Sequence, residues 1–425
     1  MFEFHFRKSL TKLPVALAVL GFAVLPLLAA TDGPITDSCD ATAGADDGSP
    51  QGGSTVVSAK PSPTAGFVND ALAPDPVSDE SRWFHLTLAT IGTRMRYSES
   101  SNKAAHGIYQ QHKEEFAGYF KFDEEGKYTI HAVVSSGYYF TRSYAETGAG
   151  QPWYQERGAN LFLRELYFQA QPVHGVELQY GSLPILRGAV SENISYDEDG
   201  YIDGERLNIR RPHDLYFDDI SVTYAYIGDY ELPNMFRRLD RFRQSNYHQF
   251  LVAKKLSSRL SMSVDLTHHG WSETVRAGAI VDTHESKIFD SLRLGVYDRY
   301  SNEDGQGVEA TAQKHFGRRL TLMGGWVSVD VRSTDLVTPY DLLSQRKSSM
   351  TLGYAPGGSL NADRFARGHS PYLNATYKIN SFLSFNVFAK NDVDPDPHYT
   401  VKNAKVVLAG FDCDLRPILR PLGIR

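Results

Sequence analysis

Residues 247–268 alternate between apolar and polar side chains, and this pattern restricts the fold strongly. The run 260–267 has Leu, Met, Val and Leu at its even positions and Ser, Ser, Asp and Thr at its odd positions. The run 247–256 alternates in a similar way, and Ser257 and Ser258 join the two. A period of two residues is the pattern of a β-strand with one apolar face. The stretch therefore predicts an antiparallel hairpin of two strands of about ten residues each.

The same alternation recurs over most of the 425-residue chain. Strands of about 9–11 residues are long enough to cross a bilayer when they are tilted. The chain is 22% charged with a mean hydropathy of −0.36, which argues against a bundle of transmembrane helices but agrees with a barrel whose strands are half polar. The net charge of −6 provides no basic field, so nucleic acid is not expected as a partner.

Residues 1–30 have the pattern of a secretory signal peptide. Arg7, Lys8 and Lys12 precede an uncharged apolar run that ends at Leu28-Ala29-Ala30, a small-residue cleavage site. A single membrane anchor is the alternative, but two prolines interrupt the run. We therefore expect a cleaved signal and an exported protein.

The rest of the chain divides into three segments. Residues 31–81 are rich in Asp, Gly, Pro, Ser, Thr and Ala and predict a disordered periplasmic linker, because they contain too few apolar side chains to form a core. Residues 82–413 carry the alternating strands and predict an all-β transmembrane antiparallel barrel. Residues 414–425 follow the last expected strand as a C-terminal tail.

One turn recurs three times along the barrel segment. Residues 255–261, 315–321 and 378–384 share the order basic, apolar, small, two variable positions, Leu, hydroxyl. Similar turns predict one rim, which we assign to the periplasm because short periplasmic turns and long extracellular loops are typical of bacterial barrels. The expected count is about sixteen strands. Eighteen is the alternative, if Lys347–Tyr354 pairs with a weak strand near Leu360–Ala366.

The strand stretches Leu163–Phe168 and Leu178–Leu183 complete a pattern that resembles bacterial outer-membrane porins, loosely including barrels of the alginate-export type. The resemblance covers about 83–413 and rests on architecture, with no short diagnostic motif. It implies an outer-membrane location and passive diffusion of solutes. It transfers no functional residue to this chain.

Charged side chains on the strands are expected to face the lumen, because Arg or Lys facing lipid at mid-depth costs about 2–4 kcal/mol. A basic lumen favours anions, including acidic sugars. The alternative is that opposite charges pair across strands and only keep the wall rigid and hydrated. The predicted pore-lining residues are Arg94, Arg96, Lys121, Glu165, Glu177, Arg206, Arg210, Asp265, Arg276, Arg293, Glu309 and Lys405.

The segment 231–244 is dense in arginine and has apolar residues at near-helical spacing. It predicts a short amphipathic helix, for which two placements remain open. The helix folds into the pore as a constriction, or it lies on the surface and contacts lipopolysaccharide phosphates. In both cases the active side chains are Arg237, Arg238, Arg241 and Arg243.

No stretch predicts catalysis, a metal or a cofactor. His268 and His269 beside Glu273 provide too few ligands for a structural or catalytic metal. The predicted function is a porin-like channel for small hydrophilic, including anionic, solutes; the alternative is a closed barrel that serves as a structural or adhesion platform. The expected partners are membrane lipid, lipopolysaccharide and the solutes, and a homo-oligomer is also compatible with the sequence.

Overall fold

The structure is a computed structural model of the whole chain. It describes residues 83–100, 103, 106–136, 145–147, 161–186, 188–189, 201–210, 216–226, 245–269, 272–283, 288–300, 305–329, 368–393 and 404–419. The expected signal peptide and linker and the arginine-rich segment 231–244 lie outside these residues, as does the end of the tail. None of the helices in these ranges is long and apolar enough to cross a membrane.

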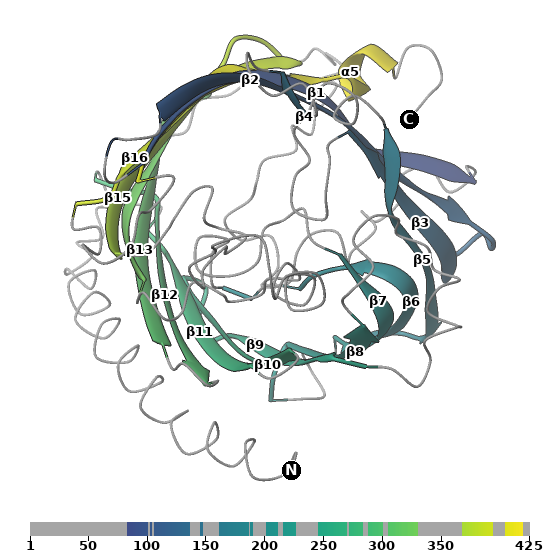
Figure 1. The fold of residues 1–425 in the computed structure, drawn as a ribbon. Coiled ribbons are helices and arrows are strands. Elements are labelled where there is room, and N and C mark those ends of the chain that lie inside the picture. Colours follow the sequence, from purple (N-terminus) through teal and green to yellow (C-terminus); the bar gives the residue numbers. More distant parts are fainter. Residues whose placement is uncertain are drawn as a thin grey trace, which may run out of the picture.

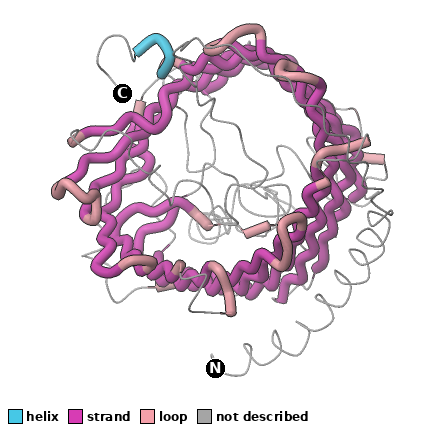
Figure 2. The backbone as a smooth tube through the Cα atoms, turned by 180° about the vertical axis from the view of Figure 1, so that it is seen from behind, coloured by secondary structure: helices cyan, strands magenta, loops and turns pink. Residues whose placement is uncertain are grey.

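Sixteen long strands form one closed, antiparallel ring, and a three-residue strand, β4, pairs beside them with β2 (Figures 1 and 2). Each long strand pairs with the next one along the chain, and β1 pairs with β17. The strands are β1 Phe84–Glu99, β2 His106–Lys121, β3 Tyr128–Ser135, β4 Ala145–Thr147, β5 Phe162–Val173, β6 Val176–Pro184, β7 Tyr201–Ile209, β8 Asp219–Tyr226, β9 Tyr247–Lys255, β10 Leu260–His269, β11 Ser272–Asp282, β12 Ser291–Tyr300, β13 Gly305–Phe316, β14 Leu320–Val329, β15 Gly368–Lys378, β16 Leu383–Asn391 and β17 Lys405–Asp414.

The prediction of sixteen strands is confirmed. The alternative of eighteen required two further strands between β14 and β15, but these two pair directly from Leu320–Tyr377 to Val329–Gly368. The polar stretch 98–113 predicts a long loop by its composition, and this prediction is wrong: β1 extends to Glu99, and β2 begins at His106 and pairs with β1 as far as Phe120. The alternation that predicts a strand is missing over residues 110–115, because charged and amide side chains occupy both faces of β2 there.

The two faces of the wall differ as the alternation predicts. Ile91, Phe250 and Leu373 belong to the outer set and are 41%, 41% and 52% exposed. The other face carries many buried polar side chains, among them Gln249, Asp265 and Thr311. A ring with apolar side chains outside and polar side chains inside suits lipid around it and a polar lumen within it.

The three repeated turns lie on one rim, as predicted, because each connects strands that run in the same two directions. The small position of the repeat has a structural reason. The Ser257 hydroxyl accepts a hydrogen bond from Leu260 N–H, and the Asn380 carboxamide oxygen accepts the equivalent bond from Leu383 N–H. Gly317 occupies the same position with φ +62°, which favours glycine.

The barrel is fastened at its seam by residues beyond the last strand. Leu415 N–H donates to the Ala89 carbonyl at 2.7 Å, and Arg416 Nη1 donates to the Thr87 carbonyl at 2.8 Å. Arg416 also forms an ion pair with Asp414 at 2.8 Å. The short helix α5 (Arg416–Leu419) therefore lies beside the start of β1 (Figure 1), where β17 no longer pairs with it.

The carboxylate of Asp290 lies just before β12, on the same rim as the repeated turns, and links this rim to the end of β13. Asp290 accepts bonds from Lys314 Nζ at 2.8 Å and from His315 N–H at 2.6 Å. Burial raises the pKa of Asp290, but the bonds from Lys314 and His315 outweigh it and leave the pKa at about 2. The ionised form is thus preferred by the folded state.

We expect Asp290→Asn to lower the free energy of unfolding at pH 7 by about 1–2 kcal/mol, since charge-assisted bonds are lost. The folded pKa lies below the unfolded value, so the contribution is complete above about pH 4 and is lost as the pH falls towards 2. Urea unfolding of the vesicle-inserted barrel measures it. Glu125→Gln, in an exposed pair with Lys127, is the control and should change little. A deficit that persists unchanged at pH 2 would contradict the assignment.

Candidate functional site in the barrel lumen

The end of β6 bends into the ring together with β7 (Figure 1), and a short stretch of chain continues from it along the lumen. We call residues 183–186 and 188–189 the inner segment. Gly181 has φ +133°, a conformation that side chains disfavour, and the chain turns inward from there. Leu183 and Leu186 are 0% and 1% exposed. In Figure 1 the ends of β6 and β7 bend into the ring.

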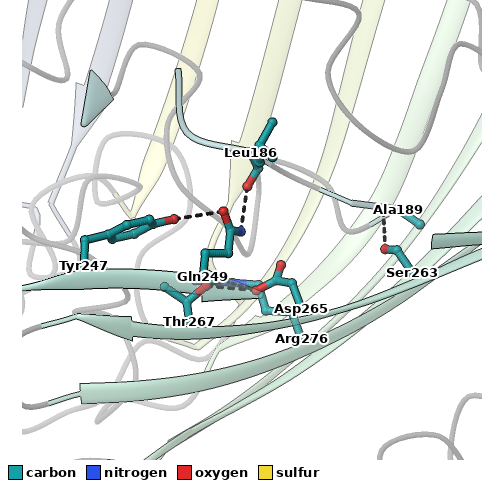
Figure 3. Close-up of polar contacts among 8 residues, drawn as sticks. All are labelled: Leu186, Ala189, Tyr247, Gln249, Ser263, Asp265, Thr267 and Arg276. Atoms are coloured by element: carbon teal, nitrogen blue, oxygen red, sulfur yellow. Dashed lines mark hydrogen bonds and ion pairs between the residues drawn. The ribbon is translucent and has the colours of Figure 1, made fainter. Parts of the chain in front are cut away.

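Lumen-facing side chains of three strands form hydrogen bonds to the backbone of the inner segment. Arg206 on β7 donates to the Pro184 carbonyl at 2.5 Å, and Gln249 on β9 donates to the Leu186 carbonyl at 3.0 Å. The Ser263 hydroxyl on β10 accepts the Ala189 N–H at 2.5 Å (Figure 3). The segment therefore follows the lumen wall from β6 to β10.

Packing supports these bonds. Leu186 contacts Leu251 and Ala253, two apolar residues on the lumen face of β9. At Gly188 an added Cβ would lie 2.1 Å from Ser263 Oγ, so the close approach to β10 requires glycine. Apolar residues on a lumen face are unusual, and here they are covered by the segment.

Next to the inner segment, β6, β7 and β8 carry a network of buried polar side chains on their lumen faces. Arg206 Nη1 donates to Gln179 at 3.0 Å, and its Nε donates to the Thr223 hydroxyl at 3.0 Å. Glu177 accepts bonds from Gln179 at 2.7 Å and from Asn208 at 2.8 Å. These side chains bond one another across β6, β7 and β8, which restrains this part of the wall.

An ion pair lies beside the network on β10 and β11. Arg276 Nη1 donates to Asp265 Oδ1 at 2.6 Å and to the Thr267 hydroxyl at 2.9 Å (Figure 3). The Arg276 and Asp265 side chains are 1% and 4% exposed. The charge of Arg276 is therefore compensated on the neighbouring strand.

Four rings stack in a row across the lumen face of β1, β2, β3 and β5. His85, Tyr119, His131 and Tyr167 follow one another with centroid separations of 4.8, 5.2 and 4.7 Å. The rings cover one another's faces. The four rings therefore stabilise the wall and do not form a surface on which a solute could stack.

The structure places four of the predicted residues in these contacts: Glu177 and Arg206 in the polar network, and Asp265 and Arg276 in the ion pair. Their contacts agree with the alternative given above, in which polar and oppositely charged side chains pair across strands. Sequence parity identified their face but could not identify their partners, because pairing depends on strand register.

The other predicted residues lie elsewhere on the strands, although Glu165 is within electrostatic range of Arg206, and Arg210 of Glu177. Arg94 Nε donates to Gln111 at 2.6 Å, and Arg210 forms an ion pair with Asp219 at 3.3 Å. A role in lining a pore stays a prediction for all of them. Arg293 is half-buried on β12, and the buried residues are Arg96 on β1, Lys121 on β2, Glu165 on β5 and Glu309 on β13.

The placement of Lys405 in the lumen is wrong. It shares a face with Phe411, which is 45% exposed on the outside, whereas Arg94 and Arg96 belong to the other face. Lys405 is the first residue of β17 and pairs with Glu99, the last residue of β1. A charged side chain is tolerated on the outer face there, because the strand ends at the rim of the barrel.

The arginine-rich segment 231–244 lies outside the described residues, so its placement stays a prediction. The inner segment was not predicted. Its signal in the sequence is the run Leu183-Pro184-Ile185-Leu186, in which alternation stops and apolar residues follow one another. Such a run marks a strand end that is apolar on both sides, as a segment packed inside a barrel must be.

Comparisons with known proteins gave matches among solved structures alone. No family model and no curated protein matches the sequence. Among solved structures, a Rhodopseudomonas blastica porin mutant is 10% identical with a TM-score of 0.44, covering 77% of this chain and 99% of that one. A low-pH structure of Pseudomonas putida OprB is 8% identical with a TM-score of 0.46, covering 78% and 92%.

The closed ring of sixteen antiparallel strands defines a porin-like β-barrel. In the described part of the chain, no three His, Cys, Asp or Glu side chains gather as metal ligands. The candidate functional site is the lumen, which the inner segment borders from β6 to β10 and half-buried polar side chains border on β14 to β16.

Proposed function

We propose that this protein is an outer-membrane channel through which small hydrophilic solutes diffuse passively. The observation that carries the proposal is the division of the wall into an apolar outer face and a polar lumen face around a closed ring. A barrel of this size encloses an aqueous passage unless it is plugged. The ordered polar groups inside suit hydrated solutes and involve no chemical step.

A second candidate is a closed barrel that serves as a structural or adhesion platform. The inner segment favours it, because it covers the lumen face from β6 to β10. Against it, lumen-facing side chains on β14, β15 and β16, such as Thr321, Thr376 and Asn386, are only half-buried. Room for solute is therefore expected against that wall.

Single-channel recording in planar bilayers decides between the two. We expect purified protein to insert and to give discrete conductance steps. Heat-unfolded protein at the same concentration is the control. Stable insertion, established by protease protection in vesicles, without any conductance would favour the platform and end the channel proposal.

Preference for anions is the finer part of the proposal. Asp265 compensates Arg276, so we assign the preference to Arg293, for which the described residues contain no bonded carboxylate. We expect Arg293→Ala to move the reversal potential across a KCl gradient towards zero, more at low salt because the screening length is about 10 Å at 0.1 M. Arg276→Ala is expected to behave differently, since it also exposes Asp265. A cation-selective wild type would retire the idea.

The proposed surroundings of the barrel rest on its outer face. We propose that the apolar band contacts membrane lipid and that charged residues at the extracellular rim meet lipopolysaccharide. Lys405 and Lys103 lie near Glu99 at that rim. A homo-oligomer is also compatible with this face, and cross-linking in native membranes tests it.

A further inference from the structure

The lumen face of β14–β16 carries a group of uncharged polar side chains beside an aromatic ring. We call Thr321, Asn374, Thr376, Asn386 and Phe388 the neutral patch. Strand register places Thr321 opposite Thr376, Thr376 opposite Asn386, and Asn374 opposite Phe388. Five neighbouring positions on three strands thus form one surface, and all are half-buried.

The polar groups of the neutral patch are largely unengaged. Among the residues that the structure describes, the side chains of Thr321, Asn374 and Thr376 form no hydrogen bond. Asn386 uses its Nδ2 to donate to Asp412 at 2.5 Å, which leaves its carbonyl oxygen available. The polar network beneath the inner segment contrasts with this, because its members bond one another.

Phe388 provides an apolar side to the same surface. It packs on Tyr372 with 6.1 Å between ring centroids. Tyr372 is itself fixed: its hydroxyl bonds Thr311 at 2.5 Å, and its ring lies over Gly325, where an added Cβ would be 3.0 Å from the ring. Phe388 therefore rests on a rigid support, and little ordering is needed when it contacts a solute.

Charges near the neutral patch are compensated. Lys390 follows Phe388 by two residues on β16. It forms an ion pair with Asp392 at 3.1 Å, and both side chains are 0% exposed. The Asp412 carboxylate, which accepts the bond from Asn386, lies within electrostatic range of Arg94 and Lys113, so these opposite charges compensate one another. A charged solute finds little attraction at this surface, whereas donors and acceptors of a neutral one find partners.

We propose that the neutral patch is a weak binding site for uncharged polyhydroxylated solutes on the permeation path. Hydroxyl groups of the solute bond to the amides and threonines, and its C–H face contacts Phe388. Apolar and aromatic surface with a few placed polar groups is the usual make-up of a small-molecule site. The inference rests on the proposed channel and names its solute class.

Blockage of the ion current by raffinose tests the inference. With the wild type we expect conductance to fall with raffinose concentration and to saturate. A polyethylene glycol of matching size, which lacks hydroxyl donors along its chain, should reduce the current without saturation. In the double variant Asn374→Ala/Thr376→Val we expect the half-saturating raffinose concentration to rise about tenfold, and in Phe388→Leu several-fold.

Phe385→Leu is the matched control, because Phe385 lies on the outer face of the same strand, against Phe411. It should leave the raffinose response unchanged. Saturation that is the same in the patch variants as in the wild type, or a raffinose response identical to that of the glycol, would overturn the site while the channel remains. Absence of any conductance in the wild type would instead overturn the channel, and this inference with it.

Discussion

Asp265→Ala is expected to lower the free energy of unfolding by about 3–5 kcal/mol, because it leaves Arg276 buried without its counter-charge. The pair is 2.6 Å apart and almost fully covered. Equilibrium urea unfolding of the barrel in lipid vesicles, followed by tryptophan fluorescence, measures the loss. No other single substitution considered for this protein is expected to destabilise it as much.

The double variant Asp265→Ala/Arg276→Ala separates the charge effect from lost packing. We expect it to be more stable than Asp265→Ala alone, since no unpaired charge remains. Thr274→Ser, a neighbouring buried lumen residue on β11, is the control for mutation in this wall. A loss below about 1 kcal/mol in the single variant would show that the pair is hydrated in the barrel and that its geometry contributes little.

Gly188→Val is expected to have the largest effect on conductance. Its side chain would overlap Ser263, because even a Cβ lies 2.1 Å from Ser263 Oγ and 2.7 Å from its Cβ. The Ala189–Ser263 bond must then break and the inner segment must move from the wall. We expect single-channel conductance to change by about twofold or more, since the lining of the passage is altered.

Two further variants make this result specific. Gln249→Ala removes the bond to the Leu186 carbonyl without adding bulk and should change conductance in the same direction as Gly188→Val. Gly324→Ala is the matched control: it is a glycine on the outer face whose added Cβ would meet its neighbours at 3.4 Å and beyond. Unchanged conductance in both inner-segment variants would mean that the segment lies away from the ion path.

The strand pattern was predictable because alternation is local. Residues 260–267 alternate in sequence, and their two sets lie on the two faces of β10 in the structure. The turn repeat was predictable for the same reason, since Ser257, Gly317 and Asn380 meet the needs of a turn with their own side chains or backbone. Strand count followed from the two together.

The boundaries of β2 were less accessible to sequence. Lys113, Glu114 and Glu115 follow one another, and such a charged run predicts a loop when it is considered alone. In the fold, Lys113 and Glu115 share the lumen face and form an ion pair at 2.5 Å, which makes the run compatible with a strand. Context of this kind depends on which neighbour supplies the opposite charge.

The sequence by itself determined the class of fold, the faces of most strands and the rim on which the repeated turns lie, because side-chain period and turn chemistry act over a few residues. Only the tertiary structure decided which charges pair, that Lys405 belongs to the outer rim, and that the inner segment lies in the lumen. Those outcomes depend on register and on closure of the ring, which bring Ala189 against β10 and β1 against β17. Contacts between residues so far apart in the chain leave no periodic trace in the sequence.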